Sequence, residues 1–158
     1  MQPRSTLPNV SSPTRIEEGM PARAGEPTYA AFKAIHFHLF QDLYAWAGQE
    51  RTYTTGRGPT PFAPPEQIAP WMEKQFAAFR ELKGLSAEGF AVASANFITE
   101  INAAHPFIEG NGRTQRIWLG GVAERAGLNF GSGPRTRRPG TRLPGSGSSW
   151  PRPSRWPS

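Results

Sequence analysis

The chain has 158 residues, enough for one domain of ordinary size, and it contains no cysteine, which excludes a disulfide framework. Its formal net charge is +6, but all 12 acidic residues and 12 of the 18 lysine and arginine residues precede position 131, so the body is neutral and gives no sign of nucleic-acid binding. No apolar run approaches the roughly 20 residues of a membrane helix, and Met1–Ser12 lacks a signal-peptide core. We therefore expect a cytoplasmic protein with no membrane contact.

Residues 1–27 are rich in Pro, Ser and Arg and are predicted to form a loosely ordered lead-in. A helix is predicted from the N-cap Thr28 to just before Gly48, because apolar residues recur there at spacings of three and four. The β-prone residues 51–55 then precede a Gly-Arg-Gly turn and Phe62, which predicts a short hairpin.

Three further helices are predicted in the second half of the chain. The first begins at Pro65, which suits a first helical turn, and ends before Gly84. The second follows the N-cap Ser86 and ends at His105, and the third runs on to Gly127. The aromatic residues that recur along one face of each predicted helix are predicted to form the core of an all-α domain.

The segment 105–116 reads His-Pro-Phe-Ile-Glu-Gly-Asn-Gly-Arg-Thr-Gln-Arg and joins the last two predicted helices. His105 titrates near neutrality, so it can act as an uncharged base toward a hydroxyl group. Glu109 offers the hard oxygen ligand that Mg²⁺ prefers. Phe107 is predicted to anchor the segment in the core.

The rest of this segment has the chemistry of an anion site. Gly110 and Gly112 permit positive φ and close backbone approach, and the Asn111 side chain adds a donor. Arg113 and Arg116 share one helix face and present forked guanidinium groups to phosphate oxygens. Each feature alone is typical of an ordinary turn or helix end, but together they predict a polyphosphate site beside a proton acceptor.

This run resembles the signature of Fic (filamentation induced by cAMP) domain proteins, His-x-Phe-x-(Asp/Glu)-Gly-Asn-Gly-Arg-x-x-Arg, with every fixed position filled. Residues 33–48 are similar to the first core helix of that family, and residues 49–52 with Phe62 are similar to its flap. The resemblance spans about residues 28–130 and is greatest to short bacterial Fic toxins. The Gly-Asn-Gly-Arg form is the one associated with nucleotide transfer.

The resemblance implies an all-α, Fic-type helical bundle with one short β-hairpin flap, and a protein adenylyltransferase that moves AMP from ATP to a hydroxyl group of a target protein. It implies that His105 is the general base and that Glu109 holds Mg²⁺. It assigns nucleotide binding to the Gly-Asn-Gly turn, which forms a phosphate cradle, and to the two arginines that follow. These residues are Gly110, Asn111, Gly112, Arg113 and Arg116. The flap, residues 49–62, would bind the target as an added strand, and an ordinary exposed hairpin is the alternative.

Regulation by an inhibitory helix is a further implication of the family. The segment Thr14–Gly19 fits the pattern (Ser/Thr)-x-x-x-Glu-(Gly/Asn), but it lies close to the first predicted core helix. A separate small antitoxin protein is therefore the favoured inhibitor. His36 and His38, two residues apart, are predicted to be structural rather than metal ligands.

Two features argue against an intact enzyme. Residues 131–158 contain six Pro, six Ser, six Arg and one aliphatic residue, which predicts a disordered basic tail produced by a frame shift or a truncation. Gly120 and Gly121 are expected to weaken the helix that carries the arginines. The alternatives are an inactive Fic remnant that binds nucleotide without transfer, a Fic enzyme that transfers UMP, phosphate or phosphocholine, and a native tail that binds nucleic acid through its arginines and tryptophans.

Overall fold

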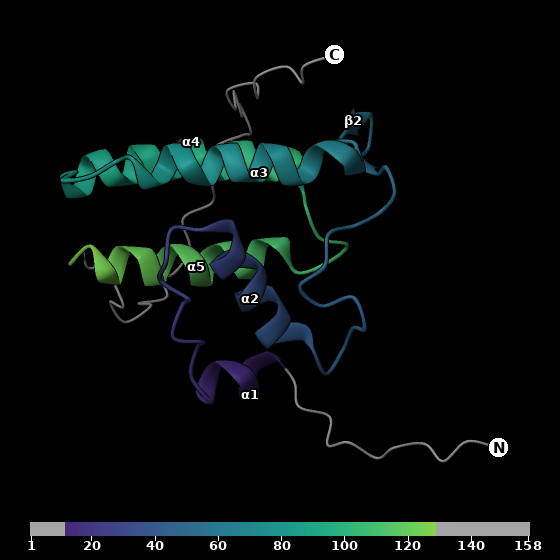
Figure 1. Ribbon diagram of the computed structural model, residues 1–158, viewed down its shortest axis with the longest axis horizontal. Helices are drawn as coiled ribbons and strands as arrows, with labels where there is room; N and C mark the ends of the chain where they lie inside the picture. Colours follow the sequence, from purple (N-terminus) through teal and green to yellow (C-terminus); the bar gives the residue numbers. More distant parts are fainter. Residues whose placement is uncertain (1–11, 129–158) are drawn as a thin grey trace, which may run out of the picture.

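The computed structural model describes residues 12–128, and the predicted tail 131–158 lies outside the described residues. Helices α3 and α4 pack side by side, α5 lies along them, and α2 crosses α5 (Figure 1). The predicted class, all-α with one short hairpin, is confirmed. The elements in chain order are α1 (Ser12–Glu17), α2 (Tyr29–Phe40), β1 (Gly56–Arg57), β2 (Thr60–Pro61), α3 (Pro65–Arg80), α4 (Ala87–Ala104) and α5 (Asn111–Arg125).

Two of the predicted helix starts are confirmed by side-chain caps. Thr28 Oγ accepts the N–H of Ala31 at 3.2 Å, and Ser86 Oγ accepts the N–H of Gly89 at 3.1 Å. The end of α2 was predicted too late, because the helix stops at Phe40. The chain then turns back on itself, and the N–H of Gly48 donates to Nδ1 of the His36 ring at 2.8 Å.

The hairpin is shorter than predicted and lies further along the chain. Gly56 pairs with Pro61 and Arg57 pairs with Thr60, so part of the predicted turn is strand. The β-prone residues before it do not form a strand. The N–H of Arg51 donates instead to the carbonyl of Pro106 at 2.8 Å. This bond joins the start of the β-prone run to the loop between α4 and α5, which carries the motif and is called the motif loop below.

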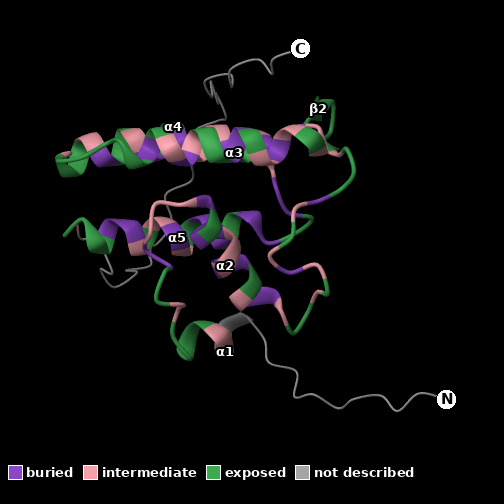
Figure 2. Ribbon diagram, in the orientation of Figure 1, coloured by how far each residue is buried: buried purple, intermediate pink, exposed green. Residues whose placement is uncertain are grey.

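The core lies between the helices, where the buried faces of α2, α3, α4 and α5 meet (Figure 2). Trp118 is fully buried at its centre. Burial of such a side chain stabilises the fold by about 1.5–3 kcal/mol. The predicted aromatic core is confirmed by the rings that surround Trp118, which belong to Phe32, Phe76, Phe79 and Phe97.

One glycine of the pair in α5, Gly121, has a packing role that the sequence does not reveal. A Cβ at Gly121 would lie 3.2 Å from Cα of Gly25 and 3.3 Å from the carbonyl oxygen of Ala24. The indole N–H of Trp118 donates to the carbonyl of Glu26 at 2.9 Å. The end of the expected loose lead-in is thus packed across α5, and Gly121 permits that close crossing.

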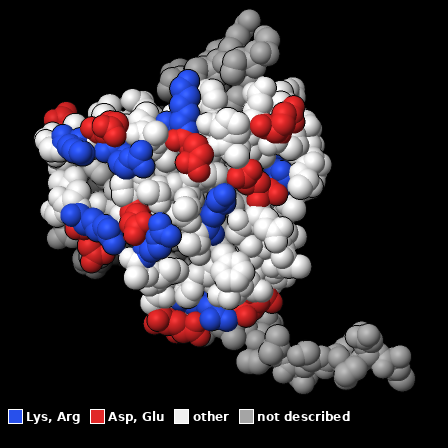
Figure 3. Space-filling model, viewed as in Figure 1, with Lys and Arg blue, Asp and Glu red and all other residues white. Residues whose placement is uncertain are grey.

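Charged side chains of both signs are interleaved on the face shown in Figure 3, which fits the neutral body inferred from the sequence. Within residues 12–128, no helix is both long enough and apolar enough to cross a membrane.

Candidate active site

The motif spans the end of α4, a short loop and the first turns of α5. His105 ends α4 in the left-handed region, with φ 47° and ψ 64°, and its N–H donates to the carbonyl of Ile101 at 2.9 Å. Left-handed backbone is uncommon for a residue with a side chain, and it persists only where the surroundings enforce it. The helix end therefore turns His105 out of the helical path.

The imidazole ring of His105 is half-buried and lies on the ring of Phe62, with centroids 4.0 Å apart and 6° between the planes. Burial lowers the pKa of His105, the positive charges of Arg51 and Arg57 lower it further, and the carboxylate of Glu109 opposes them. The ring is thus neutral near pH 7 and has the protonation state that a general base needs.

Phe107 anchors the loop in the core, as predicted. It is fully buried, and its ring stacks on Phe32 and on His36, with centroid distances of 5.7 and 3.8 Å. The Asn111 side chain braces the same residue: Oδ1 accepts the N–H of Phe107 at 3.0 Å, and Nδ2 donates to the carbonyl of Phe107 at 2.8 Å. The amide is buried and shapes the turn, and the expectation that it also donates to an anion stays a prediction.

Gly110 caps α5 with φ 83°, and a Cβ there would lie 2.4 Å from the ring of Phe40. Both the positive φ and the close aromatic contact require glycine at this position. The carbonyl of Gly110 accepts the N–H of Thr114 at 3.1 Å and the Thr114 hydroxyl at 3.0 Å, which fixes the first turn of the helix.

Glu109 lies next to the start of α5. Its side chain accepts the N–H of Gly110 at 3.1 Å, and its carbonyl is bonded to Nε2 of His36 at 2.9 Å. Among residues 12–128, no group of three or more acidic, His or Cys side chains could hold a metal ion. One exposed carboxylate fits Mg²⁺, which keeps several waters and binds largely through substrate phosphates.

The first turn of α5 consists of Asn111, Gly112 and Arg113. The N–H groups of a first helical turn have no acceptor within the helix, and with the helix dipole they favour a bound anion. Gly112 is exposed, and a Cβ there would meet nothing within 4 Å. The guanidinium of Arg113 lies over the Phe40 ring, 5.1 Å from its centroid, and Arg116 follows one turn later and is exposed.

The structure therefore brings together six of the predicted site residues around one loop, with Arg116 on the adjoining turn; the six are His105, Glu109, Gly110, Asn111, Gly112 and Arg113. Two residues that hold this loop, Arg51 and His36, were not expected to contact it from the sequence, although a structural role was predicted for His36. Arg51 is 2% exposed, and its Nε donates to the carbonyl of His105 at 2.8 Å. Its only sequence signal is a charged residue within a β-prone run, whereas His36 interrupts the apolar stripe of α2.

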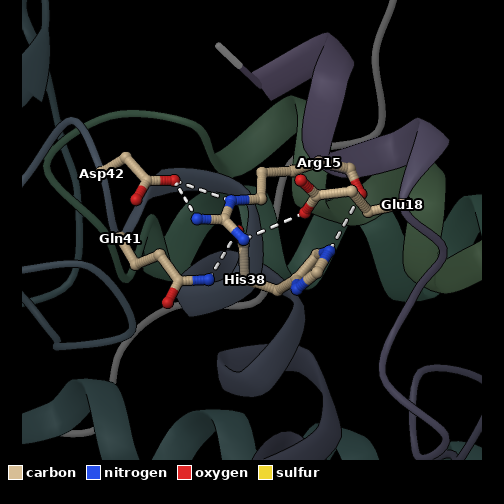
Figure 4. Close-up of polar contacts among 5 residues, drawn as sticks. All are labelled: Arg15, Glu18, His38, Gln41 and Asp42. Atoms are coloured by element: carbon tan, nitrogen blue, oxygen red, sulfur yellow. Dashed lines mark hydrogen bonds and ion pairs between the residues drawn. The ribbon is translucent and has the colours of Figure 1, made fainter. Parts of the chain in front are cut away.

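The segment considered as an inhibitory motif ends in a polar cluster between α1 and α2 (Figure 4). The guanidinium of Arg15 bonds to Glu18 at 3.0 Å and to Asp42 at 2.6 Å, and the ring of His38 bonds to the carbonyl of Arg15 at 2.9 Å. The carboxylate of Glu18 is thus engaged by an arginine of its own segment. His38, like His36, makes a structural bond to backbone, as predicted.

The Fic/DOC family profile matches residues 26–120, and this range contains the complete motif and the hairpin. The chain belongs to the Fic/DOC family. It is 42% identical over 121 residues to a probable protein adenylyltransferase, y4lH, of Sinorhizobium fredii, covering 74% of this chain and 62% of that protein. It is 36% identical over 118 residues to the protein adenylyltransferase VbhT of Bartonella schoenbuchensis, covering 73% of this chain and 25% of that protein.

Among solved structures, the Fic chain is similar to the BepC protein of Bartonella tribocorum, which was crystallised with bound AMPPNP. The TM-score is 0.59 at 28% identity, and the match covers 73% of this chain and 63% of that one. The chain thus spans less than two thirds of the length of these relatives. The family and the fold are shared over the region that carries the site.

Proposed function

We propose that this Fic domain is a protein adenylyltransferase, which transfers AMP from ATP to a hydroxyl side chain of a target protein. The observation that carries the proposal is the pairing of a neutral imidazole at the end of α4 with an anion-binding turn at the start of α5. A base and a phosphate site held by one short loop meet the main needs of phosphoryl-type transfer, which are alignment and neutralisation of charge.

In the proposed reaction, Nδ1 or Nε2 of His105 takes the proton of the target hydroxyl. The hydroxyl oxygen then forms a bond to the α-phosphorus of ATP, the bond from that phosphorus to the bridging oxygen breaks, and pyrophosphate leaves. Arg113 and Arg116 hold the phosphates together with the N–H groups of Gly112 and its neighbours. The proton on His105 is released to solvent before the next turnover.

Glu109 is the proposed ligand of Mg²⁺. The ion, when bound, would neutralise phosphate charge and orient the leaving group. The contact between the carboxylate and the N–H of Gly110 leaves further oxygen lone pairs for a cation, and it holds the side chain at the mouth of the cradle.

The target is proposed to dock on the hairpin within residues 49–62. All four paired residues of β1 and β2 are exposed, and the ring that follows β2, that of Phe62, lies against His105. An extended target segment that adds a strand here would gain main-chain hydrogen bonds and would bring one of its side chains near the imidazole.

A separate inhibitory protein is proposed to restrain the enzyme as an antitoxin restrains a toxin. The alternative, inhibition by Glu18 of the same chain, is disfavoured because Glu18 is already paired with Arg15. We expect Glu18→Gly to leave the transfer rate unchanged. A rate that rises in Glu18→Gly would assign the inhibition to α1 instead.

Incubation with labelled ATP, Mg²⁺ and a cell extract tests the proposal. We expect a labelled protein band that disappears in His105→Ala and persists in the matched control His38→Ala, which removes a histidine from the α1–α2 junction. Mass analysis of the adduct distinguishes AMP from another phosphate-containing group. Binding of ATP with no adduct in any fraction would contradict transfer and favour an inactive remnant.

A further inference from the structure

The side chain of Arg51 joins three parts of the molecule that are separate in the sequence. Its Nε donates to the carbonyl of His105 at 2.8 Å, and one terminal nitrogen donates to the carbonyl of Ala104 at 3.0 Å. The other terminal nitrogen donates to the carbonyl of Tyr53 at 2.6 Å, and the carbonyl of Ala63 accepts as well. The acceptors therefore lie at the end of α4 and on both stems of the hairpin.

A buried cation usually requires a carboxylate partner, because an isolated charge loses its hydration. Within the described part of the chain, the acceptors of the Arg51 guanidinium are four backbone carbonyls. Two of them lie at the C-terminal end of α4, where the helix dipole is negative: Ala104 is the last residue of the helix and His105 is its C-cap. The helix end thus stabilises the charge, and the charge satisfies carbonyls that have no partner within the helix.

The hairpin is tied to the same helix end by its backbone. The N–H of Ala63 donates to the carbonyl of Ala103 at 3.0 Å, and the N–H of Phe62 donates to the carbonyl of Thr55 at 2.9 Å. The Phe62 ring then lies flat on the His105 ring. Any movement of the hairpin relative to α4 would therefore alter both the position of the docked target and the orientation of the imidazole.

We infer that Arg51 is a positioning residue for the proposed transfer: its guanidinium fixes the left-handed backbone of His105 and the hairpin as one rigid unit, so that the target hydroxyl and the base stay in register. This inference rests on the proposed function, but the rigid unit itself can be observed without activity. Arg51 touches neither substrate nor phosphate in this scheme and acts through the His105 carbonyl and the hairpin stems.

The test compares Arg51→Lys and Arg51→Gln with the intact chain. Lysine keeps the charge but cannot fork to four carbonyls, and glutamine loses the charge as well. We expect kcat to fall about 10–100-fold in both, because a small misplacement of reacting groups has an effect of that size, while the Kd for ATP changes less than about twofold. The matched control is Phe90→Leu, which perturbs the core at the opposite end of α4.

A second measurement separates positioning from loss of stability and does not depend on transfer. In the folded chain, the ring protons of His105 are expected to be shifted upfield in the NMR spectrum by the parallel Phe62 ring, and the Phe62 N–H to exchange slowly. Arg51→Lys should lose the upfield shift and the slow exchange, and Phe90→Leu should keep both after an equal fall in Tm.

The inference is overturned if Arg51→Lys keeps the upfield ring shift and the wild-type kcat. It is also overturned if Phe90→Leu loses the ring shift and kcat as much as Arg51→Lys does. If Arg51→Gln does not fold, Arg51→Lys alone decides the matter. An intact chain that transfers nothing while Arg51→Lys loses the ring shift would refute the proposed function and leave the rigid unit established.

Discussion

His36 of α2 and Glu109 of the motif loop are joined by a hydrogen bond of 2.9 Å between Nε2 of the ring and the backbone carbonyl. The other ring nitrogen accepts the N–H of Gly48, which can only donate, so Nε2 carries the proton of a neutral ring. A single buried imidazole thus links the loop after α2 to the residue proposed to hold the metal.

The burial of His36 is expected to make the stability of the domain depend on pH. Burial lowers the pKa of His36 below its ordinary value of about 6.5, although the bond to Glu109 opposes the shift. His36 therefore binds a proton more readily in the unfolded chain than in the folded chain. Its contribution to the free energy of unfolding is fully present above about pH 6.5 and is lost as the pH falls below that value. We expect His36→Gln to show a flatter loss of stability over this acid range in urea titrations at several pH values, and parallel profiles for the two proteins would contradict the assignment.

Gly110→Ala is expected to destabilise the domain and to weaken ATP binding. An alanine at φ 83° costs about 1–3 kcal/mol in backbone strain, and its Cβ would overlap the ring of Phe40. Gly112→Ala serves as the stability control, because it lies in the first turn of the helix and its Cβ would meet nothing within 4 Å. Thermal unfolding should show a lower Tm for Gly110→Ala and an equal or higher Tm for Gly112→Ala, and equal shifts in both would contradict the close contact with Phe40.

Much of the fold could be predicted because helix caps and the spacing of apolar residues are strong local signals in this sequence. Thr28 and Ser86 are caps whose side chains satisfy helix N–H groups, and the spacing of apolar residues identified the helices between them. The motif loop could be predicted because its chemistry is concentrated within twelve consecutive residues. The position of His105 beside the proposed phosphate site follows from that proximity alone.

The contacts between distant segments could not be predicted. The bond between Arg51 and His105 joins residues 54 apart, and no periodicity encodes it. The same holds for the early end of α2, where the chain turns back to bring Gly48 to His36. The two bonds of the Asn111 side chain to the Phe107 backbone could not be predicted either, because a polar side chain in a turn can serve the backbone or a ligand.

Gly25 and Gly120 allow the effect of steric overlap on stability to be separated from the effect of helix propensity. A Cβ at Gly25 would lie 2.8 Å from the carbonyl oxygen of Gly121, whereas a Cβ at Gly120 would meet nothing within 4 Å. We expect Gly25→Ala to lower the free energy of unfolding by about 1–3 kcal/mol through overpacking, and Gly120→Ala to raise it by about 0.5–1 kcal/mol through helix propensity. Urea unfolding with unchanged m-values would show both effects, and stabilisation by Gly25→Ala would show that the lead-in does not cross α5 so closely.

His105→Asn tests whether His105 is the base of the proposed AMP transfer. Asparagine tolerates the left-handed backbone at this position but cannot accept the proton as imidazole does. The measurement is the amount of AMP adduct on the target, by mass spectrometry, together with the Kd for ATP of the same protein. We expect an unchanged Kd and no adduct for His105→Asn, and an adduct formed at the wild-type rate would contradict the role of His105 as the base.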